Sequence, residues 1–284
     1  MAVTGVSTIS MHQLMLTELQ EYLGAETIFM NTIWDLSSTV EPGAVDFSIP
    51  RITGGSVASW PTGGAAATEG GVTVAVDKCD LDQYKQYSIY IEDAERAKTS
   101  MDLDDLFYEV APSKIGDLIE TFIYSELKKA SATTPDNIFQ LTGASNLVPL
   151  VADLFTIAQM MDTLNIPKAD RFVAMGPAAY YSLIQNDAII NGSKSLSNEA
   201  LINGAFSKVA GLTLLYGTNV TAGEVLAYQR KSLAFAFANG NAISTAESRL
   251  ENEFRDFRAM KAIYGAKILD SGKRVILGNA TGAA

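Results

Sequence analysis

The side chains that most often perform enzyme chemistry are scarce in this sequence. The chain has one histidine, His12, and one cysteine, Cys79. A Ser-His-Asp or Cys-His catalytic site would depend on that single histidine, and a zinc site needs several cysteine and histidine ligands. His12 lies in a segment that looks like an N-terminal arm, so an ordinary exposed histidine is the favoured interpretation. A lone cysteine rules out an intrachain disulfide, and a reducing cytoplasm is the expected compartment.

Three carboxylates stand close together in the segment DKCDLDQY. Asp77, Asp80 and Asp82 could bind Ca²⁺. The EF-hand loop, however, also requires a central glycine and a terminal glutamate. Neither is present, so a solvated turn is the favoured interpretation, and no metal site is predicted.

Two arginines in the segment ENEFRDFRAMK offer a different kind of site. Arg255 and Arg258 could bind an anion together. The same stretch supplies opposite charges at Glu251, Glu253 and Asp256. A charged strand or turn at an interface, with these groups paired locally, is therefore favoured over an anion-binding enzyme site.

The glycine-rich segments do not match a phosphate-binding loop. The sequence has no GxxxxGK[ST] motif, and no GxGxxG follows a strand pattern. In RFVAMGPAAYYSLIQND, Gly176 ends a predicted strand and Pro177 begins a predicted helix, because proline suits the first helical position. The neighbouring Ala174, Met175 and Ala178 offer no polar group to a ligand. This junction is interpreted as a structural connection between a strand and a helix, without a ligand site, and no cofactor is predicted.

Composition limits the classes of partner. The 284 residues are 48% hydrophobic and 19% charged, enough for one large domain or two modest ones. The formal net charge of −11 repels phosphates, so sequence-specific nucleic-acid binding is not expected. No apolar run approaches the roughly 18–20 residues that cross a bilayer, so no membrane association is expected.

The first part of the chain changes from a helical to a strand pattern. Residues 1–44 look like an arm with a helix that Gly24 would end. Residues 45–92 carry alternating apolar residues on both sides of a glycine-rich middle, which predicts a long hairpin. Between positions 52–76 the only charged side chain is Glu69. Such a hairpin buries little by itself, so we expect it to pack on something else, such as another copy of the chain.

Two helices are predicted next. Asp102 would cap a short helix that Pro112 interrupts, and Pro112 would open a second, longer helix. The second helix would end near Lys128 and Lys129, where the helix dipole favours cations. Its apolar stripe consists of Ile115, Leu118, Ile119, Phe122, Ile123 and Leu127.

The remainder alternates helices and strands. Pro149 is predicted to open a helix with Phe155 on its apolar face, and residues 171–175 to form a strand. Further strands are predicted at LTLLYGTNV and LAFAFA, and two more joined by a hairpin turn at 270–273. The helix after Gly176 is expected to pack against a sheet through Tyr180, Tyr181, Leu183 and Ile184.

The order of these parts resembles the major capsid proteins of tailed bacteriophages, which share the HK-97 capsid fold. The resemblance covers nearly the whole chain. It is carried by YSIYIEDAERAKTSMDLDDL before the long helix and by the phrases PKADRFVAMGPAAYYSLIQND, INGAFSKVAGLTLLYGTNV and FRDFRAMKAIYGAKILDSGKRVIL. It implies an α+β fold with an N-arm, an extended β-hairpin loop, a peripheral domain built on a long spine helix, and an axial domain.

The resemblance also implies a division of the chain. The expected parts are an N-terminal arm at 1–44, the extended loop at 45–92, the peripheral domain with its spine helix at 93–144, the axial domain at 145–240, and return strands of the peripheral domain at 241–284. Some family members crosslink through a lysine on the extended loop, but residues 52–76 contain none, so that chemistry is not expected. Only 44 residues precede the loop, so a separate scaffolding protein is expected.

The function implied by the resemblance is that of a structural virion protein without enzymatic activity. It would be the major capsid subunit, assembled in the host bacterial cytoplasm into hexamers and pentamers of an icosahedral head that encloses double-stranded DNA. A portal and decoration proteins are further expected partners. Two alternatives stay open: an encapsulin-type cage of the same fold, and a small soluble α/β enzyme with a site at Gly176-Pro177 or at the arginine pair.

Contacts between copies are expected in two segments. The nearly uncharged loop carries Trp60, and tryptophan is enriched at interface centres. The charged stretch that begins at Glu251 is the second segment. The candidate contact residues are Val57, Trp60, Pro61, Glu69, Glu251, Glu253, Arg255 and Arg258.

Overall fold

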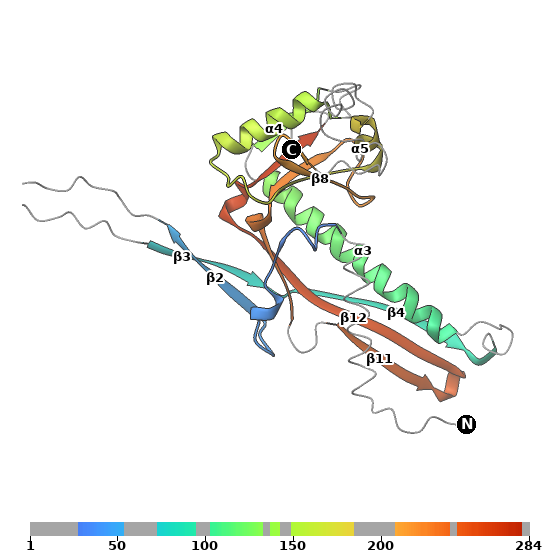
Figure 1. Cartoon of the computed structure of the whole chain (residues 1–284). Helices are drawn as coiled ribbons and strands as arrows, with labels where there is room; N and C mark the ends of the chain where they lie inside the picture. The colour runs from blue at the N-terminus through green and yellow to red at the C-terminus, as the bar shows by residue number, and fades with distance from the viewer. Residues whose placement is uncertain are drawn as a thin grey trace, which may run out of the picture.

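The computed structural model describes residues 28–53, 73–94, 103–132, 137–142, 149–184, 208–238 and 243–279. Within these residues the strands form sheets of two, five and six strands, accompanied by three α-helices. Figure 1 shows a compact part that holds the six-stranded sheet, and two long strand ribbons that extend in opposite directions. No helix in the described ranges combines the length and apolar character needed to cross a bilayer.

The longest element is the helix α3, Leu103–Ala132, which is continuous for 30 residues. The predicted break at Pro112 is wrong, because Pro112 lies inside α3. A proline within a helix removes one backbone hydrogen bond, but here the buried stripe continues on both sides of it and outweighs the loss. Leu118, expected in the stripe, is exposed. The buried stripe consists of Phe107, Ala111, Ile115, Ile119, Ile123 and Leu127.

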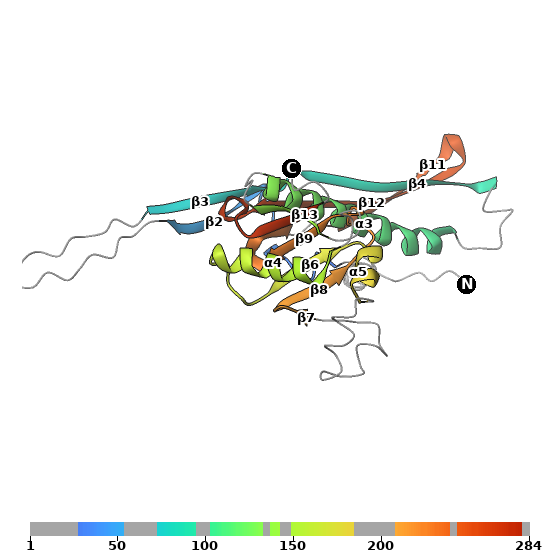
Figure 2. The ribbon, with the colours of Figure 1, turned by 90° about the horizontal axis from the view of Figure 1, so that it is seen from above.

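The five-stranded sheet is organised around one long strand, β12, Arg255–Ile268. One edge of β12 pairs antiparallel with β4, Gln83–Glu92, and the other with β11, Ile243–Leu250, and then with β10, Leu233–Phe237. A short strand, β1, Trp34–Asp35, pairs parallel with β10. The helix α3 lies against one face of this sheet, as Figure 2 shows, and shares a core with Met260, Ala262 and Tyr264 of β12. We call β4, β12 and β11 the packed ribbon.

The six-stranded sheet has the order β5-β13-β9-β6-β8-β7 and is covered on both faces. One face packs against α4, Val151–Thr163, and α5, Pro177–Ile184. The other packs against α3, in the same core as the packed ribbon. The strands are β5 (Ile138–Gln140), β6 (Arg171–Met175), β7 (Lys208–Val209), β8 (Leu212–Tyr216), β9 (Val225–Gln229) and β13 (Val275–Asn279).

The segment before the hairpin differs from the expected free arm. Residues 1–27 lie outside the described residues, but Phe29 and Ile33 are fully buried in the main core. The buried carboxylate of Glu120 on α3 accepts hydrogen bonds from the backbone N–H groups of Phe29 (2.9 Å) and Met30 (3.1 Å). A turn, the strand β1 and the short 3-10 helix η1, Ser37–Thr39, follow. Residues 28–36 therefore belong to the body of the molecule, because their apolar side chains complete its core.

The predicted hairpin at 45–92 is partly wrong. The strand β2, Asp46–Thr53, pairs antiparallel with β3, Thr73–Asp80, and this pairing ends at the root of the hairpin. The next strand, β4, joins β12 instead. Its apolar residues Tyr87 and Ile89 pack on the core that contains α3, so burial draws β4 away from the hairpin.

The expected hairpin turn at 270–273 is also wrong. The strands on either side of the 3-10 helix η7, Asp270–Gly272, are β12 and β13, and they lie in different sheets. As a consequence the chain does not follow the expected boundaries at 145–240 and 241–284. The strand β10 belongs to the five-stranded sheet, and β13 belongs to the six-stranded one.

Several side chains on the helices also differ from expectation. Pro149 precedes α4, whose N-cap is Leu150, and Phe155 points to solvent rather than into the core. On α5, Tyr180 and Leu183 are buried as expected, but Tyr181 is exposed. The side chain of Ile184 lies outside the described residues.

Candidate intersubunit surface

The sheet of β2 and β3 projects from the body as a hairpin with two different faces (Figure 1). Side chains alternate across a strand, and exposure follows that alternation here. Intermediate and buried side chains, such as Phe47 and Cys79, face the body. We call the opposite face the outward face; it consists of the exposed Ser48, Pro50, Ile52, Val74, Val76 and Lys78.

The outward face is apolar far from the body and charged near it. Ile52 is 73% exposed and stands directly opposite Val74, which is 58% exposed. Pro50 and Val76 form the next pair. Toward the root, Lys78 bonds to the carboxylates of Asp46 (2.9 Å) and Asp80 (3.2 Å). An exposed apolar patch bordered by charge is typical of a protein–protein contact.

The root of the hairpin is fixed to the body by close backbone contact. The Leu81 N–H donates to the Val45 carbonyl oxygen (2.9 Å), where the two strands leave the body. Gly265 on β12 lies beneath the chain at Asp80, since a Cβ added to Gly265 would come within 2.3 Å of the Asp80 carbonyl oxygen. Only glycine allows this approach. The neighbouring Cys79 thiol is fully buried, and burial raises its pKa to about 12.

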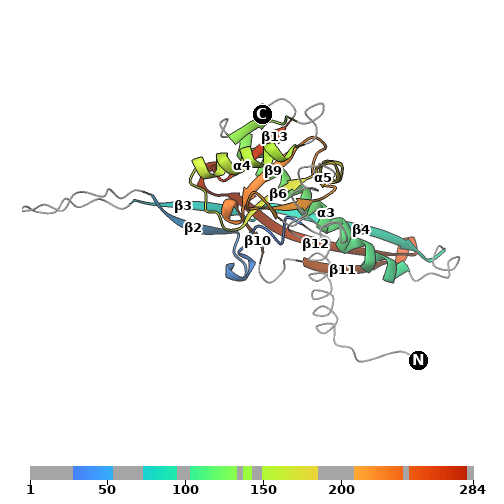
Figure 3. The same ribbon diagram turned by 45° about the horizontal axis from the view of Figure 1, so that its top comes forward.

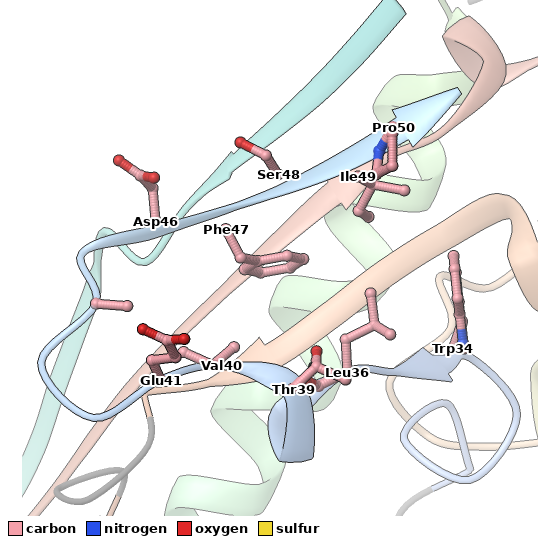
Figure 4. Close-up of a pocket in the computed structure, with 11 residues that line it drawn as sticks. Trp34, Leu36, Thr39, Val40, Glu41, Asp46, Phe47, Ser48, Ile49 and Pro50 are labelled. Atoms are coloured by element: carbon pink, nitrogen blue, oxygen red, sulfur yellow. Dashed lines mark hydrogen bonds between the residues drawn. The ribbon is translucent and has the colours of Figure 1, made fainter. Parts of the chain in front are cut away.

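A pocket of about 440 Å³ lies between β2 and the segment that follows β1. Figure 4 shows Phe47 and Ile49 on the β2 side, and Trp34, Leu36 and Val40 on the other. The pocket is open to solvent. Phe47 on its wall also packs against Val40, Leu81 and Ala236, so the hairpin contacts the body beside the pocket.

Beyond the pocket, ion pairs connect the hairpin to the body again. The Arg51 Nη1 lies 3.1 Å from the Asp270 carboxylate of η7, and its Nε lies 3.4 Å from Asp77 on β3. Arg274 binds the same Asp270 at 2.5 Å. The four side chains form a network of alternating charge, which we call the clasp.

The predicted charged segment forms the far end of the packed ribbon. Glu251 and Glu253 lie in the 3-10 helix η6, Glu251–Glu253, which joins β11 to β12. Arg255 forms an ion pair with Glu253, as expected, and its guanidinium stacks 4.4 Å above the Tyr90 ring. Arg258 pairs with Glu247 of β11 (3.1 Å). The two arginines are therefore occupied within the chain.

A third arginine at this end, Arg249, is not among the residues that the sequence pattern indicates. It donates to both carboxylate oxygens of Asp93 (3.1 and 2.6 Å) and to Asp256 (2.9 Å). Asp93 lies 156 positions away in sequence. Only the cross-strand register of β4, β12 and β11 brings the three together, and no local pattern signals it.

An exposed aromatic residue marks the same end. Phe254 is 71% exposed and has a left-handed backbone with φ of 49°. Its carbonyl oxygen accepts a hydrogen bond from the Asp93 N–H (3.0 Å). A left-handed conformation is rare for a bulky residue, so the turn holds Phe254 in place while its ring projects outward.

Four of the candidate contact residues, Val57, Trp60, Pro61 and Glu69, lie outside the described residues. Of the candidate ligand sites, Gly176-Pro177 joins β6 to α5, and Met175 beside it is fully buried. Asp77, Asp80 and Lys78 take part in the ion pairs above. Across the described ranges, no three His, Cys, Asp or Glu side chains gather closely enough to hold a metal ion.

Comparisons with known proteins identify the architecture. No family model matches the sequence, and no curated protein does either. Among solved structures, a chain of Mycobacterium phage Che8 has a TM-score of 0.71 at 17% identity, covering 91% of this chain and 93% of that one. The capsid structure of cyanophage P-SCSP1u has a TM-score of 0.71 at 18% identity, covering 91% and 88%. A virus-like particle from Pyrococcus furiosus has a TM-score of 0.58 at 11% identity, covering 94% and 99%.

These structures match nearly the whole of this chain and of their own chains, so the similarity concerns the complete architecture and not one sheet. The mixture of a long helix, a projecting hairpin and two further sheets agrees with the α+β fold that the sequence resemblance implies. The chain has the HK-97-like capsid fold found in phage capsid structures.

Proposed function

We propose that this chain is the major capsid subunit of a tailed phage and assembles with itself into an icosahedral shell around double-stranded DNA. One observation carries the proposal: the hairpin β2–β3 presents an apolar outward face that nothing in the described part of the chain covers. A two-stranded hairpin with exposed apolar side chains is marginal in water. It becomes favourable when another copy of the chain covers it.

The parts of the molecule take the roles expected of such a subunit. The hairpin corresponds to the extended loop, α3 with the packed ribbon to the peripheral domain, and the six-stranded sheet to the axial domain. Identical subunits close a shell through repeated heterologous contacts. Each contact can be weak, since many act together in one particle.

The charge of the chain suits a container for nucleic acid. A formal net charge of −11 disfavours tight binding to phosphates. DNA could then be packed and released without strong attachment to the wall. The mature protein would reside in the virion, after assembly in the host cytoplasm with a separate scaffolding protein, a portal and, in some shells, decoration proteins.

A cage of the encapsulin type is the second candidate. The structure of a virus-like particle from Pyrococcus furiosus supports it, although its TM-score of 0.58 is lower than those of the phage structures. The two candidates differ in what the shell encloses. Particles purified from infected cells that contain DNA favour the capsid, and particles that contain a specific enzyme favour the cage.

An enzyme with an unrecognised site is the candidate of another class. The residues at both of its candidate locations are engaged within the fold. Met175 and Gly176 are buried in the framework, and Arg255 and Arg258 pair with carboxylates of the same chain. We accordingly assign the chain a structural role without catalysis.

The direct test removes residues that connect β2 to β3 in the sequence. Deletion of residues 54–70 should leave a folded subunit with an unchanged circular dichroism spectrum, because β2, β3 and the body are retained. Electron microscopy should show closed shells for the wild-type chain and none for the deletion. The matched control replaces the exposed Phe155 on α4 with serine, which should leave shells intact. Normal shells from the deletion variant would refute the proposed role of the hairpin.

A further inference from the structure

The hairpin is attached to the body at two separated places. The first is the root, where Leu81 donates to Val45 and the chain crosses Gly265. The second is the clasp at Arg51. Arg51 lies five positions after Asp46 on β2, so about 17 Å separates these two residues at the rise of an extended strand. A strand held only at its root can pivot, whereas a strand held at two points has a defined direction.

The stretch between the two attachments spans the pocket of about 440 Å³. Phe47 and Ile49 face that pocket from β2, and Trp34 and Leu36 face it from the body (Figure 4). Beside the pocket, near the root, Phe47 packs against the cluster of Val40, Leu81 and Ala236. At the far side of the pocket, the clasp attaches the hairpin to the body through the ion pair of Arg51 with Asp270.

The body side of the clasp is rigid. Asp270 and Ser271 have left-handed backbones, with φ of 51° and 54°. The fully buried Asn137 side chain donates to the carbonyl oxygens of Gly272 (3.3 Å) and Val275 (2.8 Å). The turn that presents the Asp270 carboxylate is thus fixed from beneath.

The hairpin side of the clasp is well defined too. Arg51 and Asp77 lie on the body-facing side of adjacent strands, so the guanidinium is shared between a carboxylate of the hairpin and one of the body. The side chains of Arg51, Asp77, Asp270 and Arg274 are 21% to 34% exposed. Partial burial strengthens an ion pair relative to one in open water, and leaves it sensitive to salt.

We propose that the clasp of Arg51, Asp77, Asp270 and Arg274 is a positioning device that fixes the direction in which the hairpin leaves the body. In the shell subunit proposed above, this direction sets the angle between neighbouring copies, so the clasp controls the uniformity of shell curvature. The inference about hairpin direction concerns the single chain. The inference about curvature rests on the proposed function.

The test measures hairpin direction in the isolated subunit. Spin labels on Val74→Cys in β3 and Thr156→Cys in α4 give an electron–electron distance distribution. The native Cys79 needs no replacement, since a fully buried thiol with a raised pKa does not react with the label. Asp270→Asn is the main variant, because asparagine tolerates the left-handed backbone at this position.

We expect the Asp270→Asn and Arg51→Gln variants to widen the distance distribution about twofold, since the charged attachment is lost. Arg51→Lys should recover part of the narrow distribution, because one ion pair can re-form. Asp46→Asn is the control: it removes an ion pair within the hairpin and leaves the clasp intact. In the wild-type chain, raising the salt concentration should widen the distribution toward that of the variants.

The distance distributions test the role of the clasp in hairpin direction, whereas shell formation by the wild type tests the proposed function. Equal widths for wild type, Asp270→Asn and Arg51→Gln, with unchanged unfolding temperatures, would overturn the inference even if the wild type forms shells. If the distributions widen and the wild type forms shells, electron microscopy of Asp270→Asn should show a broader range of particle sizes. Failure of the wild type to assemble under any condition would refute the proposed function and leave the distance measurement valid.

Discussion

The two ribbons of this molecule are built from the same kind of strand but are stabilised differently. The packed ribbon places Met260, Ala262 and Tyr264 on the core that contains α3, and each is at most 3% exposed. The hairpin β2–β3 presents Ile52 and Val74 to solvent. Figure 3 shows the two extending to opposite sides of the compact part.

The difference indicates where each ribbon finds its partner. The packed ribbon has its partner, α3, in the same chain, so its stability belongs to the subunit. The hairpin is held by its root, by the packing of Phe47 and by the clasp, while its outward face is exposed. In the proposed shell, another copy of the chain covers that face. Changes in the packed ribbon should therefore alter folding, and changes on the outward face should alter assembly.

The largest effect on folding is expected beneath the packed ribbon. Ile119→Ala on α3 should lower the free energy of unfolding by about 3–4 kcal/mol, because it leaves a cavity in a fully buried core. The neighbouring exposed Leu118→Ala should change it by less than about 0.5 kcal/mol. Urea denaturation of both variants measures the contrast. An equal loss of free energy of unfolding in the two variants would show that Ile119 of α3 is not packed against the packed ribbon.

The free energy of unfolding should also depend on pH, because the carboxyl group of Glu120 is buried in the same core. Burial raises the pKa of this carboxyl group from 4.5 to about 7, and the backbone N–H groups of Met30 and Phe29 oppose the shift. Asp117 on the same helix adds a like charge. Because the folded state holds the proton more tightly, this stabilising contribution is complete below about pH 4.5 and is lost as pH rises through about 7.

The expected loss from this group is roughly 2–3 kcal/mol between pH 4.5 and 8. Thermal unfolding across that range, compared with Glu120→Gln, isolates the contribution, since glutamine cannot titrate. If the wild type and Glu120→Gln share the same pH profile, Glu120 does not titrate in this range.

A smaller effect is expected at the root of the hairpin. Gly265→Ala brings a methyl group within 2.3 Å of the Asp80 carbonyl oxygen, so the hairpin root must move. We expect a loss of about 2 kcal/mol in the free energy of unfolding, typical of overpacking. Gly176→Ala is the control, since its nearest neighbour would be 3.8 Å away. A Gly265→Ala variant as stable as the wild type would mean that the root is not held by this contact.

The smallest expected change is an increase in the free energy of unfolding, whereas the substitutions above should lower it. Phe254→Asn at the far end of the packed ribbon should raise the free energy of unfolding by about 0.5 kcal/mol, because asparagine adopts the left-handed backbone more readily than phenylalanine. Chemical denaturation with many replicates can resolve this change. A loss of about 1 kcal/mol or more would indicate that the exposed ring makes contacts within the chain.

Local patterns in the sequence predict most of the elements but not their partners. Alternation predicts the strand at 45–49, a short strand-like run before Gly176 predicts the strand at 171–175, and the apolar stripe predicts most of α3. The break at Pro112 is wrong because packing of the stripe on both sides of the proline outweighs one lost hydrogen bond. The hairpin turn at 270–273 is wrong because turn residues do not reveal that β12 and β13 belong to different sheets.

For the candidate contact surface too, the sequence predicts local features but not contacts between distant residues. Alternation and glycine content predict a hairpin segment with a nearly uncharged middle, and the local pairing of Arg255 with Glu253 follows from neighbouring charges. The clasp could not be inferred, since Arg51 and Asp270 are 219 positions apart. Only the crossing of the hairpin over β12 brings them together.

In the proposed shell, the outward face of the hairpin binds another copy of the chain. The most direct measurement is sedimentation velocity over a range of concentrations, for the wild type and for the Ile52→Asp, Val74→Asp double variant. We expect the wild type to assemble into one discrete large particle, and the double variant to stay a folded monomer with an unchanged unfolding temperature. A wild type that remains monomeric at every concentration, with and without co-expressed phage proteins, or a double variant that assembles like the wild type, would contradict this proposal.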